Sequence, residues 1–240
     1  MHKNAGVLLM CLLVGASGCA VTQEAKSVQK SGFLGDYSLL TEGKRSTFKQ
    51  GPEDQALLVY KNPVANWNKY KKVLLDPVTV WLGKDSDMKE LSVEDRHMLA
   101  GLFWAKLEEA LKKDYEIVNQ PGPDVLRVQA AITEGSKSWV VLDTVTAVYP
   151  QARILAGGKS LVTGVSLFTG DASVEGKLTD TETGAILFEV ADRRGGTKSI
   201  DRSMFKSWGD VDNAYRFWAE ELRYRLCQWR GATNCVEPKA

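Results

Sequence analysis

The sequence predicts an α+β fold, in which a mostly antiparallel sheet ends in a C-terminal β-hairpin and is covered by two main helices. The first observation is the hairpin: alternating apolar and polar residues flank the turn from Asp180 to Gly184, whose glycine suits a positive φ. The other two observations are helical periodicities over residues 92–113 and 211–230. Because a two-stranded hairpin is not stable alone, we expect these helices to cover its apolar side.

The N-terminus has the features of a bacterial lipoprotein signal peptide over residues 1–18. Lys3 is followed by an apolar run from Ala5 to Ala16, which is too short to cross a bilayer as a permanent helix. Small residues then lead into Cys19, which resembles a lipobox, although Ala16 stands where leucine is usual. The resemblance implies that the chain is cleaved before Cys19 and that Cys19 is lipidated. An ordinary secretory signal followed by a free cysteine is the alternative.

The residues after Cys19 bear on location and domain organisation. Ala20 stands where aspartate, in enteric bacteria, resembles a signal for retention in the inner membrane. We therefore expect an outer-membrane protein of a Gram-negative bacterium, lipid-anchored and facing the periplasm. Residues 19–32 are polar and lack apolar periodicity, which predicts a flexible tether after the lipidated cysteine. A single periplasmic domain over residues 33–235 and a tail over residues 236–240 follow.

The elements of the domain follow in order along the chain. Residues 72–81 are strand-like, but Pro77 cannot donate to a ladder, so we expect an edge position or a bulge there. Ser92 is a suitable N-cap for the helix that runs to about Lys113. Short strands are expected over residues 115–118 and 125–133. The hairpin comes next, and Gly231 is placed to end the final helix.

Three stretches carry a family resemblance. They are the GFLGDYS stretch from Gly32, the LLDPVTVW run from Leu74 and the TDTETG turn from Thr179. Together they resemble the bacterial lipoprotein family called domain of unknown function 3313, over nearly the whole mature chain. The resemblance implies a lipoprotein and brings no catalytic residues that could be carried over.

The charge of the chain bears on its partners. The chain has 31 Lys and Arg against 30 Asp and Glu, a formal net charge of +1, and loss of Lys3 with the signal peptide leaves a balance of zero. This excludes a global attraction for nucleic acid or for acidic substrates. A local basic loop over residues 192–206 makes Arg193, Arg194 and Lys198 candidate contacts to anionic lipid or cell-wall polymer. A solvated connector is the alternative.

Candidate catalytic and metal-binding groups are few. His2 leaves with the signal peptide, and His97 falls on the polar face of its helix, so we exclude histidine-rich zinc sites and expect no metal or cofactor. The GGKS stretch from Gly157 resembles the end of a phosphate-binding loop. The glycine that the full pattern needs five positions before Gly158 is Arg153 here.

The hairpin register offers one pair of carboxylates. If Leu178 faces Ile186, then Glu175 stands directly opposite Glu189 on the outward side of the hairpin. Such a pair can serve acid/base chemistry or bind a hard cation. A solvated pair screened by Lys177 is the alternative.

Two cysteines remain in the mature chain after Cys11 is lost and Cys19 is lipidated. They are Cys227 and Cys235, near the C-terminus. The periplasm is oxidising, and Gly231 lets the chain turn back after the helix, so we predict a disulfide between them.

These observations favour a lipid-anchored, non-enzymatic envelope lipoprotein that acts as a periplasmic binding or assembly component. Its partners would be an envelope protein or a cell-wall polymer. The alternative is a carrier of lipid or of a small hydrophobe, or an unrecognised envelope enzyme, with a cavity lined by the apolar residues 138–168. A deep cavity there favours the carrier, whereas a filled core with an exposed patch favours the binding component.

Overall fold

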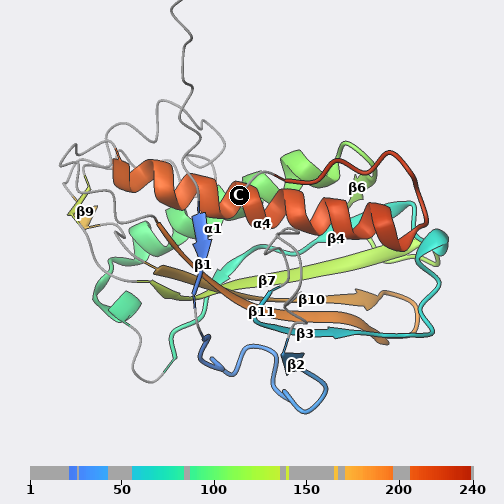
Figure 1. Ribbon diagram of the computed structural model, residues 1–240, viewed down its shortest axis with the longest axis horizontal. Coiled ribbons are helices and arrows are strands. Elements are labelled where there is room, and N and C mark those ends of the chain that lie inside the picture. Colours follow the sequence, from blue (N-terminus) through green and yellow to red (C-terminus); the bar gives the residue numbers. More distant parts are fainter. Residues whose placement is uncertain are drawn as a thin grey trace, which may run out of the picture.

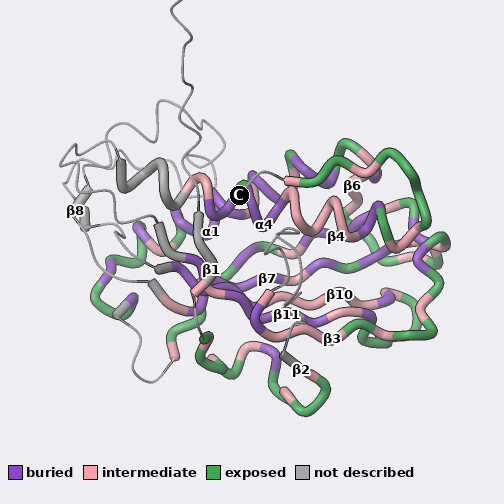
Figure 2. The backbone as a smooth tube through the Cα atoms, in the orientation of Figure 1, coloured by how far each residue is buried: buried purple, intermediate pink, exposed green. Residues whose placement is uncertain are grey.

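The computed structural model describes residues 22–25, 27–42, 56–83, 87–135, 139–140, 165–166, 171–196 and 206–238. Within these ranges the fold is α+β, as predicted: a mixed sheet is covered on one face by two long helices (Figure 1). The apolar core lies between the sheet and the helices, where buried residues concentrate (Figure 2). In the part of the chain that is described, no helix has both the length and the apolar character that a membrane span requires.

The strand order of the main sheet is β2-β3-β11-β10-β7-β4-β6. Neighbours are antiparallel except at β4, which is parallel to both β7 and β6, while β1 pairs with β11 and β5 pairs parallel with β7. Strands β8 and β9 pair with each other separately. The strands are β1 (Thr22–Glu24), β2 (Thr41–Glu42), β3 (Leu58–Lys61), β4 (Lys72–Leu75), β5 (Thr79–Val80), β6 (Glu116–Val118), β7 (Val125–Gly135), β8 (Trp139–Val140), β9 (Val165–Ser166), β10 (Asp171–Asp180) and β11 (Ile186–Gly196).

The two long helices are α1 (Val93–Leu111) and α4 (Lys206–Trp229), and two short 3-10 turns are η1 (Trp67–Lys69) and η2 (Asp87–Glu90). Ser92 caps α1 as predicted, since its Oγ accepts a hydrogen bond from the backbone N–H of Asp95 at 3.1 Å. Helix α4 begins five residues before the predicted start at residue 211. The helices pack together through Phe103, whose ring stacks on Tyr215 at 4.8 Å.

Pro77 interrupts the strand predicted over residues 72–81. Leu75 pairs with Val128 and Thr79 with Ala131, so four steps along one strand match three along β7. The chain therefore bulges at this point, as predicted, because proline lacks the N–H that a continuous ladder needs. Strand β4 itself lies between β7 and β6 rather than at an edge.

The predicted hairpin register is wrong by two residues. Leu178 faces Phe188 rather than Ile186, and the register shifts between Leu178 and Thr179. The cause is the turn, where Asp180 N–H donates to Ala185 C=O at 3.0 Å and Gly184 takes a φ of +72°. The bulge that follows gives Leu187 a place in the core. Glu175 consequently faces Ala191, so the predicted pair of glutamates does not form.

Part of the tether predicted over residues 19–32 forms a strand. Thr22–Glu24 pairs with the end of β11 next to the shorter β3, and Ala25 N–H donates to Arg193 C=O at 2.9 Å. Strand β11 extends beyond β3 and leaves unpaired backbone groups at this edge. A polar segment can satisfy them without apolar side chains. Composition alone could not predict this pairing.

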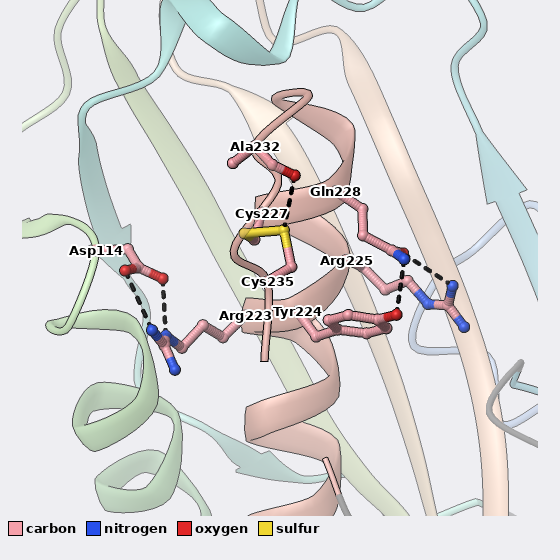
Figure 3. Close-up of a disulfide and its surroundings, with 8 residues drawn as sticks. All are labelled: Asp114, Arg223, Tyr224, Arg225, Cys227, Gln228, Ala232 and Cys235. Carbon is pink, nitrogen blue, oxygen red and sulfur yellow. Dashed lines mark hydrogen bonds and ion pairs between the residues drawn. A yellow bond between two sulfur atoms is a disulfide. The ribbon is translucent and has the colours of Figure 1, made fainter. Parts of the chain in front are cut away.

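The structure contains the predicted disulfide between Cys227 and Cys235, with Cα atoms 5.6 Å apart. Gly231 adopts a φ of +73° and turns the chain back at the end of α4, as predicted. Figure 3 shows the bond beside Arg223, whose guanidinium pairs with Asp114 at 2.7 Å. The bond therefore holds the C-terminal segment against the end of the helix.

Replacing both cysteines by serine should lower the free energy of unfolding by about 2 to 3 kcal/mol, because the short loop is no longer closed in the unfolded chain. Urea denaturation of the two proteins measures the difference. Reductant should reproduce the loss in the native protein and leave the serine variant unchanged. Two free thiols in the unreduced native protein would contradict the bond.

Candidate functional site

A cavity of about 270 Å³ lies between the sheet and α4. Strands β3, β11, β10 and β7 form its floor, α4 forms its wall, and two residues of α1 close it. Most of its lining is apolar, which suits an apolar ligand or part of one. The apolar lining residues are Ala56, Val59, Phe103, Leu107, Val128, Ala130, Val174, Leu178, Phe188, Val190, Phe217, Trp218, Leu222 and Trp229.

A row of small residues explains why this space is not filled. Gly176 in β10 pairs with Ala130 in β7 on one side and with Val190 in β11 on the other, and Val190 pairs with Val59 in β3. A Cβ on Gly176 would meet Val190 Cγ1 at 3.3 Å, so glycine fits this register best. A glycine inside a strand marks a close approach of this kind, and Gly176 is the signal in the sequence that could have indicated the site.

One end of the cavity holds a buried ion pair. Asp192 accepts hydrogen bonds from Trp218 Nε1 at 2.7 Å, from Arg194 Nε at 3.2 Å and from the backbone N–H of Leu57 at 3.3 Å. The Arg194 guanidinium also lies 3.5 Å from the ring centroid of Phe217. These charges offset each other, and removing either partner would leave the other buried and uncompensated.

This pair corrects the prediction of a basic loop. Arg194 was expected to contact a partner, but its side chain is only 2% exposed, and Arg193 is half-buried in the same strand. The reason is that β11 continues to Gly196, so both residues belong to the sheet. Lys198, the third predicted contact, lies outside the described residues, as does Cys19, the predicted lipidation site.

The other end of the cavity is aromatic and carries a lysine. Trp229 packs on Phe188 with ring centroids 4.9 Å apart and on Trp67 at 4.5 Å. Lys61 Nζ lies 5.0 Å from the Trp229 ring centroid, and burial lowers the pKa of this amine. Because Lys61 lines the cavity and is an exposed residue, it marks the mouth.

The opposite face of the sheet is covered by residues 27–42. There Glu175 accepts hydrogen bonds from the backbone N–H of Ser31 at 2.8 Å, from that of Leu34 at 3.4 Å and from Tyr37 Oη at 2.6 Å. Gly32 and Gly35 have φ angles of +100° and +82°, which let this segment curl over the carboxylate. The GFLGDYS stretch is therefore a structural clasp around Glu175.

The two glutamates differ from the prediction of a solvated pair. Glu175 is fully buried and Glu189 is 1% exposed, because the clasp covers the face that was expected to meet water. Glu189 stands opposite Lys177, and no hydrogen bond reaches its Oε2 from the described part of the chain. Burial raises the pKa of Glu189; Lys177 opposes this shift, and the charges of Asp36 and Glu175 add to it.

The TDTETG turn is also structural. Asp180 accepts hydrogen bonds from Lys69 Nζ and Tyr70 Oη, both at 2.7 Å, and from two backbone N–H groups of its own turn. Burial alone would raise the pKa of Asp180, but these donors hold it well below its usual value. The turn is thereby fastened to the η1 segment.

The remaining predicted sites supply no further cluster. His97 is exposed on α1, as predicted. Among the described residues, no group of three or more His, Cys, Asp or Glu side chains is arranged to hold a metal ion. The GGKS stretch lies outside the described residues, and of residues 138–168 only β8 and β9 are described, neither of which lines the cavity. The cavity predicted along residues 138–168 therefore lies mostly outside the described residues, and the cavity under α4 is lined by other parts of the chain.

Substituting the two buried glutamates by glutamine should have opposite effects at pH 7. Glu175→Gln places an amide against the donors of the clasp and should destabilise the protein by about 1 to 3 kcal/mol. Glu189→Gln removes a poorly satisfied carboxylate and should stabilise it by about 1 kcal/mol.

The gain from Glu189→Gln should depend on pH. The folded-state pKa of Glu189 is raised above 4.5, so its ionisation costs stability as the pH rises through that value and costs nothing below it. Urea denaturation at pH 7 and near pH 4 tests this, because the gain should vanish at the lower pH. Equal losses in both variants at pH 7 would contradict the description of this face.

Comparison with known proteins gives a family and weak structural likenesses. A search of curated proteins finds no match. The chain is similar to the PelC dodecamer from Paraburkholderia phytofirmans, with 12% identity, a TM-score of 0.34 and coverage of 73% of this chain and 96% of that one. It is also similar to a DUF4136 family protein from Bacteroides thetaiotaomicron VPI-5482, with 14% identity, a TM-score of 0.34 and coverage of 72% and 95%. Likenesses at these scores carry no weight for function.

The family model described as "Protein of unknown function (DUF3313)" matches residues 29–222. This span runs from the clasp around Glu175 through the hairpin and into α4, and so includes most of the cavity lining. By this match, the chain belongs to the DUF3313 family, as its three motifs had predicted.

Proposed function

We propose that this chain is a lipid-anchored envelope lipoprotein that acts without catalysis, as a periplasmic binding component with its binding site in the cavity under α4. The observation that carries this proposal is the apolar cavity itself, enclosed by four strands and a long helix. Its volume of about 270 Å³ lies just below the range of roughly 300–1,000 Å³ that is usual for ligand pockets. It therefore fits a small hydrophobe or one chain of a larger molecule.

The polar groups of the cavity favour binding over catalysis. Among the groups that could act chemically, Asp192 and Arg194 are bound to each other, Asp192 is also bound to Trp218, and Glu221 pairs with Arg225. A carboxylate held by three donors is a poor general base, because protonation would break those bonds. The cavity is thus suited to hold a molecule.

The proposed anchor places the cavity near a membrane. Strand β1 begins three residues after Cys19, and three residues span at most roughly 11 Å. With Cys19 lipidated, the β1–β11 edge would be held beside the bilayer, and we place it at the outer membrane because Ala20 follows the cysteine. The anchored protein would stay beside the membrane that supplies its ligand, with β1 nearer to the Asp192 end of the cavity than to the Lys61 end.

A carrier of lipid or of a small hydrophobe is the second candidate, favoured by the same apolar lining. It differs from a binding component because a carrier must release its ligand to an acceptor. Transfer of a bound fluorescent hydrophobe from the protein to vesicles measures this difference. An envelope protein or a cell-wall polymer remains the proposed partner of a binding component.

The anchor is tested by labelling growing cells with radioactive palmitate. The native protein should take up label and sediment with membranes, because several acyl chains anchor stably. Cys19→Ser should abolish both the uptake of label and the sedimentation with membranes. Cys227→Ser, which keeps Cys19, should leave these two properties intact. Label that persists in Cys19→Ser would overturn the lipid anchor.

The cavity is tested with 1-N-phenylnaphthylamine, a neutral dye that fluoresces in apolar surroundings. Wild-type protein should bind it with a stoichiometry near one, and Val190→Phe should weaken binding at least about tenfold because the ring fills the space above Gly176. Val64→Phe is the matched control, because Val64 is 87% exposed and does not line the cavity.

Circular dichroism shows whether Val190→Phe is folded, and Val59→Phe is a second variant in the same row. Absence of dye binding to the wild type, or unchanged binding in both folded variants, would overturn the cavity as a binding site.

A further inference from the structure

The cationic residues around the cavity differ in whether they already have partners within the protein. We propose that the cavity binds a single-chain amphiphile with an anionic head, such as a fatty acid, whose carboxylate contacts Lys61 Nζ and whose chain lies under α4. This inference rests on the proposed function of the cavity and adds the chemical class and the orientation of the ligand. It follows from which cations of the lining already have partners.

Three of the four cationic residues around the cavity are engaged within the protein. Arg194 pairs with Asp192 at 3.2 Å, and Arg225 pairs with Glu221 one turn earlier on α4. The Lys177 amine lies on the opposite face of the sheet, 6.0 Å from the ring centroid of Phe33 in the clasp. None of these three is available to a ligand's head group without breaking an internal contact.

Lys61 differs from them. It is the last residue of β3, it pairs with Phe188 of β11, and no described carboxylate forms an ion pair with its amine. Its Nζ sits over the ring of Trp229, a wall residue of the cavity. The same surroundings lower the pKa of this amine through burial, and an anion placed beside it would offset that effect.

The opposite end of the cavity cannot take the head group. The Asp192 carboxylate already lies there, and an incoming carboxylate would stand beside a like charge in a buried place. Arg194 cannot offset a second anion while it pairs with Asp192. The carboxylate is therefore directed to the mouth, and the chain to the apolar row of Val59, Val190 and Ala130.

Shape agrees with this orientation. The lining between the two ends is apolar, and a linear chain can follow the strand direction from Lys61 toward Ala56. At about 270 Å³ the cavity has room for one short chain rather than for a two-chain phospholipid. The occupant is thus a molecule with one acyl chain.

The test uses the mature chain carrying Cys19→Ser, exported behind a secretory signal, so that no acyl group of its own competes. Decanoate, 1-decanol and decylamine share one chain length and differ only in the head group. Each is titrated at pH 8, below its micelle concentration, by dye displacement and by calorimetry. Decanoate should bind about tenfold more tightly than 1-decanol, the strength expected of one hydrogen bond to a charged group.

Lys61→Met should remove this preference and leave the affinity for 1-decanol unchanged, and Lys61→Glu should shift the preference to decylamine. Lys71→Met is the matched control, because Lys71 is exposed and does not line the cavity, and it should retain the tenfold preference.

Equal binding of decanoate and 1-decanol to the wild type, or a preference that survives Lys61→Met, would overturn the anionic head group while leaving the cavity as a binding site. Binding of none of the three compounds, together with no dye binding, would overturn the cavity itself.

Discussion

The register of the β10–β11 hairpin decides what each face of the sheet presents. With Leu178 opposite Phe188, the helix-facing row places Gly176 beside Val190 and brings Asp192 under Trp218. If Leu178 instead paired with Ile186, Val190 would stand opposite Val174 and Gly176 would stand beside Phe188. The Phe188 ring would then fill the space. The cavity therefore depends on the bulge after Leu178, and the bulge depends on the turn that Asp180 organises.

Buried carboxylates fasten distant segments to this hairpin. Glu175 holds the clasp at Ser31 and Tyr37, Asp180 holds Lys69 and Tyr70, and Asp192 binds the backbone before β3 and the Trp218 side chain. Each carboxylate accepts several hydrogen bonds, so its burial is compensated. Neighbouring residues of a strand point to opposite faces of the sheet. Glu175 therefore contacts the clasp on one face, while Gly176, the next residue, forms part of the cavity floor on the other.

The sequence predicts those parts that depend on local physics. Helix α1 follows from its cap and its apolar face, the break at Pro77 from a missing N–H, and the disulfide from two remaining thiols beside Gly231. The errors lie where the outcome depends on distant partners. Nothing near Glu175 shows that Ser31, 144 residues earlier, will cover it, and nothing near Thr22 shows that β11 has a free edge there. Arg194 likewise lies in a basic stretch of sequence that is typical of a loop, but its side chain is buried in the core.

The contrast between these satisfied charges and Lys61 supports a role in binding. An ion pair such as Asp192–Arg194 stabilises the fold only while both partners are present, and it offers nothing to a ligand. The amine of Lys61 is held over an aromatic ring without a described carboxylate partner. It contributes less to the stability of the fold than a paired charge does, since burial disfavours its charged form. Such an amine gains most from an anion that arrives from outside. Its place at the mouth of an apolar space then matches the two parts of an amphiphile, with the charge at the rim and the chain inside.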